Sequence, residues 1–180
     1  SFHALIRQVA SFPVPIVALV QGRCLGGAFE LVLACHEVLA TDDAVFACPE
    51  IKLGVFPPVL AAIGPGRLGA AWTERLLLTG GELSAAQARS TGWVGGTLEA
   101  DTPTLEQGLA WHDAHFNGLS ASALRQAVKA ARRGANLPAQ LDVVLDDLER
   151  QYVDEVVTSH DGNEGIEAFI ARRKPVWLDA

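Results

Sequence analysis

The chain has 180 residues, with no methionine, a single tyrosine and only three cysteines. Cys24, Cys35 and Cys48 are odd in number and show no C-x-x-C spacing, which argues against a disulfide scaffold and against a zinc site. This pattern favours a reducing compartment, and we expect a cytoplasmic protein. Cys24 lies in a glycine-rich turn, where a small apolar filler is a simpler interpretation than a reactive thiol.

Basic charge and long hydrophobic runs are scarce as well. Lys and Arg number 14 against 21 Asp and Glu, and the formal net charge of −7 argues against nucleic-acid binding through a basic surface. No apolar run approaches the ~20 residues of a membrane-spanning helix. The short run Ile16–Val20 is not preceded by a basic cluster, so a secretory signal is not indicated either. The remaining composition, 49% hydrophobic and 19% charged, is typical of a soluble globular protein.

A glycine-rich turn joins the β-favouring run Ile16–Val20 to an apolar helix predicted over residues 26–35. The first N–H groups of a helix lack backbone partners, and together with the helix dipole they can hold an anion. Gly26 and Gly27 have no Cβ atoms, so a ligand could approach the backbone closely there. The glycine spacing matches neither G-x-G-x-x-G nor a P-loop, so neither of these phosphate-binding motifs is present.

Two carboxylates belong to this region. Glu30 follows Gly27 by three residues, where it would repel a phosphate but would suit an oxyanion reaction that needs a proton carrier. The helix is apolar nearly all round, so burial should raise the pKa of Glu30; a structural ion pair with Arg23 is the alternative. Glu50 follows Pro49 in a predicted loop, where apolar neighbours favour a pocket wall over plain surface.

The segments PIVALVQGRCLGGAFELVLAC and VFACPEIKLGVFPP resemble the signature of the crotonase (enoyl-CoA hydratase/isomerase) family. The resemblance continues through LLLTGGELSAAQARSTGWV and DGNEGIEAFIARRKPVW, and so covers nearly the whole chain. The segments IKLGVFPPV and EGIEAFIARRKPVW look most like the branch of cyclohexa-1,5-diene-1-carbonyl-CoA hydratases. The resemblance implies an α/β fold: a partial crotonase-like ββα spiral core over residues 1–117 and an α-helical, trimerising C-terminal region over 118–180.

The resemblance also implies an activity and site residues. Gly27 matches the glycine whose N–H forms half of a thioester oxyanion hole, with Gly26 beside it. Glu30 and Glu50 match the acid and base of the hydratases, and Phe169 and Arg172 match positions that approach coenzyme A. The expected substrate is an α,β-unsaturated or cyclic dienoyl-CoA thioester, with no metal or separate cofactor and with a homotrimer or dimer of trimers as the assembly.

Two alternatives stay open at this point. One is an isomerase of the same family, which needs a single carboxylate; the other is a non-catalytic, oligomerising acyl-CoA-binding protein. The family pattern has further sequence ahead of Ser1, where it places the second oxyanion N–H and much of the CoA-binding loop. The chain also departs from the pattern at Pro58, where glycine is frequent and its N–H helps place water, and at His36, where aspartate is frequent.

Periodicity and turn residues predict the other elements. His112 and His115 lie three residues apart on a predicted helix. A solvent-exposed helix face explains this spacing better than a metal site, because no third ligand is evident. The expected helices cover residues 1–11, 59–68 with an interruption at 64–66, 70–78, 84–90, 102–116, 120–133, 138–159 and 162–174, and the expected strands cover 16–20, 37–41, 44–48 and 93–98.

Overall fold

The computed structural model describes residues 1–179 and shows a mixed α/β fold. Six short strands form two sheets of three, in the orders β1-β3-β6 and β2-β4-β5. All neighbouring strands are parallel except β4 and β5, which are antiparallel. The strands are β1 (Val17–Val20), β2 (Arg23–Leu25), β3 (Glu37–Thr41), β4 (Val45–Ala47), β5 (Glu82–Ser84) and β6 (Gly96–Leu98).

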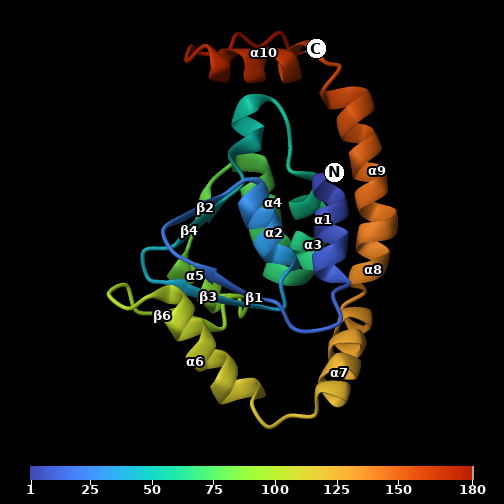
Figure 1. Ribbon diagram of the computed structural model, residues 1–180. Helices are drawn as coiled ribbons and strands as arrows, with labels where there is room; N and C mark the ends of the chain where they lie inside the picture. The colour runs from blue at the N-terminus through green and yellow to red at the C-terminus, as the bar shows by residue number, and fades with distance from the viewer. Residues whose placement is uncertain (180) are drawn as a thin grey trace.

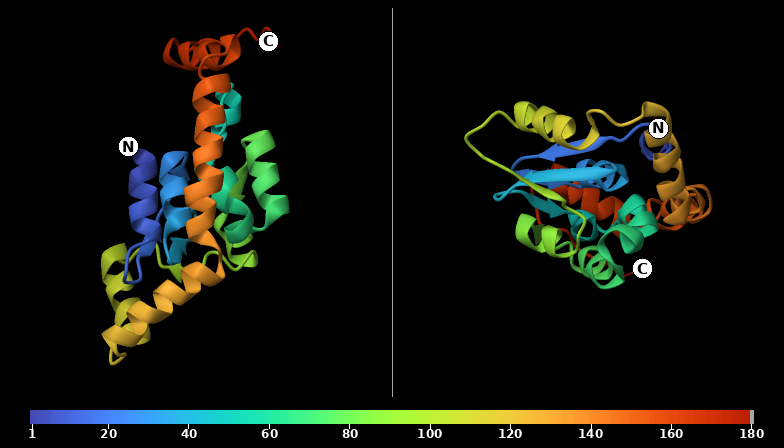
Figure 2. Two further views of the ribbon diagram at one scale, coloured as in Figure 1. Left: turned by 90° about the vertical axis from the view of Figure 1, so that its right-hand side faces the viewer. Right: turned by 90° about the horizontal axis from the view of Figure 1, so that it is seen from below.

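Helices connect the strands and build the second half of the chain. A column of helical segments climbs one side of the molecule, and α10 then lies across the top (Figure 1; Figure 2). The first helices are α1 (Phe2–Ala10), α2 (Gly27–Ala34), α3 (Pro58–Leu68), α4 (Ala70–Thr79) and α5 (Ala85–Ser90), with the 3-10 helix η1 (Pro49–Leu53) before α3. The later segments are α6 (Thr104–Phe116), α7 (Ala121–Gly134), α8 (Leu137–Ala139), the π-helix η2 (Gln140–Val144), α9 (Leu145–Gln151), the π-helix η3 (Tyr152–Val156) and α10 (His160–Ile170).

Aromatic side chains of the hydrophobic core hold α2 in place among the strands and the surrounding helices. Phe29 of α2, Phe46 of β4 and Trp93 ahead of β6 contact one another, with ring centroids 4.9–5.6 Å apart. The three side chains are buried, and a side chain of this size contributes about 1.5–3 kcal/mol when it leaves water. Helix α2 is therefore anchored along its apolar faces, as its composition predicts.

Most of the predicted elements are present, within a few residues of their expected ends. Helix α5 begins with a full capping box formed by Ser84 and Gln87. Two expectations were wrong in detail. Residues 23–25 form a strand instead of part of a turn, because β2 pairs in register with β4. Glu50 lies on the 3-10 helix η1 and not in an open loop.

The expected break in α3 is absent as well. The helix continues through Pro65, because Gly64 lets it pack closely on Thr73 of α4 and this packing outweighs the one backbone bond that proline removes. Helix α10 ends at Ile170, four residues earlier than expected, and Arg172 has a left-handed φ of 52°. Within residues 1–179, no helix has both the length and the apolar content to cross a bilayer.

Candidate active site

The turn before α2 presents unpaired amides. Gly26 has a φ of 57°, and its N–H donates to the carbonyl of Ala47 at 2.8 Å, which fixes the turn against the end of β4. Helix α2 begins at the next residue, and the N–H groups of Gly27, Ala28 and Phe29 find no acceptor among residues 1–179. These amides form the positive end of the helix dipole. The site therefore offers hydrogen-bond donors to a ligand, as the sequence predicts.

Glu30 is buried at this end of α2, with 5% of its surface exposed. Its Oε1 accepts a 3.0 Å hydrogen bond from the N–H of Leu60, in the first turn of α3. Burial raises the pKa of Glu30, the Leu60 amide lowers it, and the charge of Glu50 raises it again, with a net upward shift. Arg23, the alternative structural partner, pairs instead with Glu82 at 2.5 Å.

Glu50 approaches the same turn from η1. A Cβ atom at Gly26 would lie 2.9 Å from Glu50 Oε1, so this close approach needs glycine as much as the positive φ does. The other oxygen, Oε2, is buried and has no hydrogen-bond partner among residues 1–179. Burial raises the pKa of Glu50. An unpartnered buried acceptor costs about 1–3 kcal/mol, and a catalytic role is one of the explanations for such a group.

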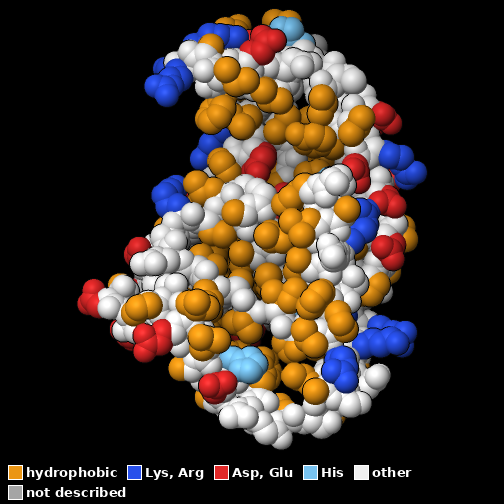
Figure 3. All heavy atoms as spheres, viewed as in Figure 1, with side chains coloured by type: hydrophobic (Ala, Val, Ile, Leu, Met, Phe, Trp, Pro, Cys, Tyr) orange, Lys and Arg blue, Asp and Glu red, His pale blue; other side chains and the backbone are white. Residues whose placement is uncertain are grey.

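The two carboxylates converge because of the strand pairing. Leu25 of β2 lies opposite Ala47 of β4, so the parallel strands deliver the start of α2 and the start of η1 to the same edge. The carboxylates are close enough for the charge of Glu50 to raise the pKa of Glu30. The space-filling view shows the molecule hollowed between α10 and the body, with apolar walls and an acidic side chain inside (Figure 3).

The cysteines beside this site are not activated. Cys24 and Cys48 are buried free thiols, and burial raises the pKa of Cys24 to about 11 and that of Cys48 further. Neither thiol is ionised near neutral pH, so neither is a nucleophile. The interpretation of Cys24 as a small apolar filler agrees with this environment.

The opposite end of α2 is closed by two arginines. Arg67 donates to the carbonyls of Leu33 and Cys35 at 3.0 and 2.9 Å, and Arg132 donates to that of Ala34 at 2.6 Å. The Nε of Arg132 also donates to His36 Nε2 at 3.1 Å. Burial and the two arginine charges lower the pKa of His36 to about 4, so the ring is neutral and structural.

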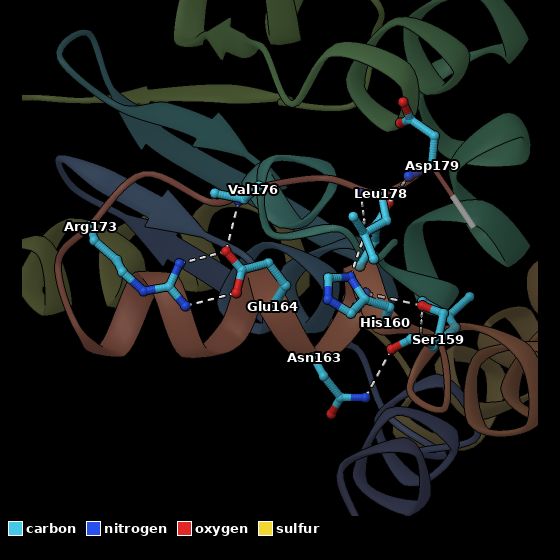
Figure 4. A network of polar contacts seen from close by, with 11 residues as sticks. Ser159, His160, Asn163, Glu164, Arg173, Val176, Leu178 and Asp179 are labelled. Carbon is cyan, nitrogen blue, oxygen red and sulfur yellow. Dashed lines mark hydrogen bonds and ion pairs between the residues drawn. The ribbon is translucent and has the colours of Figure 1, made fainter.

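Helix α10 packs directly on the helix that carries Glu50. Gly165 lies so close to Leu53 that a Cβ there would collide with its carbonyl oxygen, and a Cβ at Gly54 would lie 2.6 Å from the carbonyl oxygen of Asp161. Figure 4 shows Glu164 facing Arg173 and Val176, which it binds through both oxygens. This carboxylate therefore holds the tail that follows α10.

The remaining predicted residues lie outside the carboxylate pair. Phe169 on α10 is 67% exposed, and Arg172 is exposed beyond the helix end, with no side-chain hydrogen bond within residues 1–179. Their proposed contacts with coenzyme A stay predictions. His115 stacks on Trp111, with ring centroids 4.1 Å apart. Tyr152, which the sequence did not indicate as a site residue, packs edge-on against Phe56, and burial, with the charges of Glu50 and Glu30, raises the pKa of its phenol.

Comparison with known proteins supplies the relatives of the chain. Residues 1–180 match the family model described as enoyl-CoA hydratase/isomerase. The chain is 38% identical over 177 residues to the cyclohexa-1,5-dienecarbonyl-CoA hydratase of Thauera aromatica, covering 98% of this chain and 67% of that one. It is 33% identical to a probable enoyl-CoA hydratase of Mycobacterium bovis, covering 97% and 66%. A solved enoyl-CoA hydratase from Mycobacterium avium subsp. paratuberculosis superposes with a TM-score of 0.85 at 29% identity, covering 99% and 71%. The chain thus spans about two thirds of the length of these curated relatives.

Proposed function

The chain belongs to the enoyl-CoA hydratase/isomerase family, and from this premise we propose that it is an acyl-CoA hydratase, a hydro-lyase that adds water across a conjugated double bond. The observation that carries the proposal is the convergence of Glu30 and Glu50 beside the unpaired amide of Gly27. An isomerase needs one carboxylate to move a proton, so the retention of two favours hydration. Coenzyme A enters as part of the substrate.

The geometry supports a separate role for each of the three groups. The thioester carbonyl accepts a hydrogen bond from the N–H of Gly27, which stabilises the enolate that forms as water adds. Glu30 takes a proton from the water and the hydroxyl bonds to carbon, while Glu50 gives its proton to the acyl framework. One carboxyl gains a proton and the other loses one, and exchange with solvent restores both.

The surroundings of each carboxyl favour this assignment. Amides at the start of α3 donate to Glu30 and favour its charged form, which a base needs. Glu50 has a buried oxygen without a donor, and burial raises its pKa, which favours the protonated form that an acid needs. The reverse assignment predicts that the two glutamine variants exchange their effects on the pH profile.

A cyclic dienoyl-CoA thioester is the substrate that we propose within this class. The similarity to the Thauera aromatica hydratase supports it, and so does Pro58. Proline at the first position of α3 has no N–H with which to place water, so water must be held by another group and can attack a different carbon. Unchanged product regiochemistry in a Pro58→Gly variant would argue against this reading.

Turnover of two substrates tests the function. The protein is incubated with a cyclic dienoyl-CoA and with crotonyl-CoA, and loss of the conjugated chromophore is followed. We expect hydration of the cyclic substrate in preference to the linear one. An intact oligomer that turns over neither would favour the alternative, a non-catalytic acyl-CoA-binding protein.

We also propose a homotrimer, or a dimer of such trimers, in the cytoplasm. Val143, Val144, Val153 and Val157 are exposed along the helical column. Exposed apolar side chains grouped on one surface are typical of subunit contacts. Light scattering on the purified protein measures the assembly, and a monomer at micromolar concentration would contradict it.

A further inference from the structure

Two polar groups near the active site have no partner within residues 1–179. The Oε2 atom of Glu50 is a buried acceptor without a donor. The hydroxyl of Tyr152 makes no hydrogen bond, although the side chain is half-buried. The mechanism above uses Glu50 but leaves the phenol without a role. The buried Glu50 oxygen needs a donor from a ligand or from water, and the hydroxyl of Tyr152 is free to bind the same ligand.

The position of Tyr152 is fixed by an aromatic contact. Its ring packs edge-on against Phe56, with centroids 5.6 Å apart and planes at 79°. Phe56 lies in the link between η1, which carries Glu50, and α3, whose amide binds Glu30. The phenol is therefore held beside the segment that supports both carboxylates. Tyr152 also begins a π-helical turn, a distortion that is frequent at functional sites.

We propose that the hydroxyl of Tyr152 is a third polar group of the active site, which donates a hydrogen bond to the oxygen of the water that adds to the substrate. It supplies the donor that Pro58 cannot. The phenol keeps its own proton: the water proton still goes to Glu30, and the hydroxyl still goes to carbon. This inference rests on the proposed function and deepens it.

The electrostatics of the site suit a donor that stays protonated. Burial is the main cause of a raised pKa of Tyr152, followed by the charges of Glu50 and Glu30. Other charged groups on the same helical column include Glu149, which pairs with His3 of α1, Arg150, which pairs with Asp147, and the exposed Asp154 and Glu155. The phenol is thus neutral throughout the neutral pH range.

A spectroscopic titration tests the placement without using activity. Tyr152 is the only tyrosine in the chain, so phenolate absorbance at alkaline pH reports on this residue alone. We expect Glu50→Gln to lower the pKa of the phenol, because a negative charge that opposes its ionisation is removed. Glu155→Gln, an exposed change one turn along the same helix, is the matched control. Equal shifts in the two variants would overturn the placement.

Kinetics then test the role. In Tyr152→Phe, kcat should fall about tenfold, the value of one hydrogen bond made in the transition state, and KM should change little. Phe56→Leu removes the ring contact but keeps the hydroxyl, so its kcat should fall by less than that of Tyr152→Phe. Wild-type turnover by Tyr152→Phe would overturn the inference. If the wild-type protein hydrates neither substrate, the proposed function fails instead, and the phenol titration still reports on the geometry.

Discussion

The two ends of helix α2 differ in whether their polar groups have hydrogen-bond partners. At the C-terminal end, arginine side chains donate to the carbonyls of Leu33, Ala34 and Cys35, and the adjacent His36 is held neutral. At the N-terminal end, three amides have no acceptor among residues 1–179, and Glu50 has a buried oxygen without a donor. Both ends belong to one eight-residue helix, in which Glu30 is buried near the start and Ala34 is buried at the end.

This difference separates the end of the helix that contributes to stability from the end that is available for function. Hydrogen bonds to the last carbonyls stabilise the helix, and cations there also favour its dipole. At the other end, the buried oxygen of Glu50 without a donor lowers stability, and it is useful only if a ligand completes it. We therefore expect substitutions at the N-terminal end to remove turnover while sparing the fold, and substitutions at the C-terminal end to do the reverse.

The largest effect is expected from the carboxylates. Glu30→Gln and Glu50→Gln should each reduce kcat by at least about a hundredfold, because each removes a proton-transfer group. Steady-state hydration kinetics measure the loss. Glu82→Gln, which alters an exposed glutamate paired with Arg23, is the control and should retain wild-type turnover. A loss in the control equal to that in the other two would refute the assignment.

A backbone change isolates the amide of Gly27. Gly27→Pro removes this N–H at the first helical position, where proline is tolerated. Loss of one oxyanion donor should reduce kcat by about a hundredfold or more. Gly27→Ala keeps the N–H and adds a Cβ 3.3 Å from the ring of Phe2, which can shift slightly. If alanine and proline reduce kcat equally, crowding and not the amide explains the loss.

The C-terminal end should respond in stability instead. Arg132→Met leaves the carbonyl of Ala34 without its donor and should lower the free energy of unfolding by about 2 kcal/mol, with kcat within threefold of wild type. Denaturant unfolding measures the change. Arg133→Met, an exposed neighbour, should stay within about 0.5 kcal/mol. A catalytic loss in Arg132→Met without loss of stability would break the comparison.

A small gain in stability is expected at His36. The N–H of Ile16 donates to Nδ1, and Arg132 donates to Nε2, but a neutral imidazole accepts at only one nitrogen. In His36→Asp, a carboxylate can accept from both and pairs with the arginine, so the free energy of unfolding should rise by about 1 kcal/mol. His36→Asn, which keeps one acceptor without charge, is the control. Equal stability of the two variants would reject this explanation.

The sequence predicted the local structure around Gly27 and Glu30 better than the long-range contacts. Glycine spacing and a carboxylate inside an apolar helix indicated Gly27 and Glu30 as a candidate site, because local pattern decides helix starts and burial. The family resemblance added Glu50. The approach of Glu50 to Gly26 depends on the pairing of β2 with β4, and the three-residue strand β2 is too short for a periodic signal.

Long-range contacts explain the other misses. Nothing local to Tyr152 indicates that it packs on Phe56, about a hundred residues earlier in the chain. The continuity of α3 through Pro65 depends on Thr73 of the next helix. The arginine caps of α2 likewise come from distant segments, so the sequence could place neither of them.

The most direct test is the pH dependence of stability in Glu30→Gln. Since the folded state raises the pKa of Glu30 above its usual value of 4.5, its contribution to stability is full below that value and is lost as pH rises through the folded pKa. Denaturant unfolding from pH 4 to pH 8 should show the variant gaining on the wild type as pH rises and exceeding it at pH 8. A variant that is less stable than wild type at pH 8, with a difference independent of pH, would contradict the claim that this end of α2 is kept for function at the expense of stability.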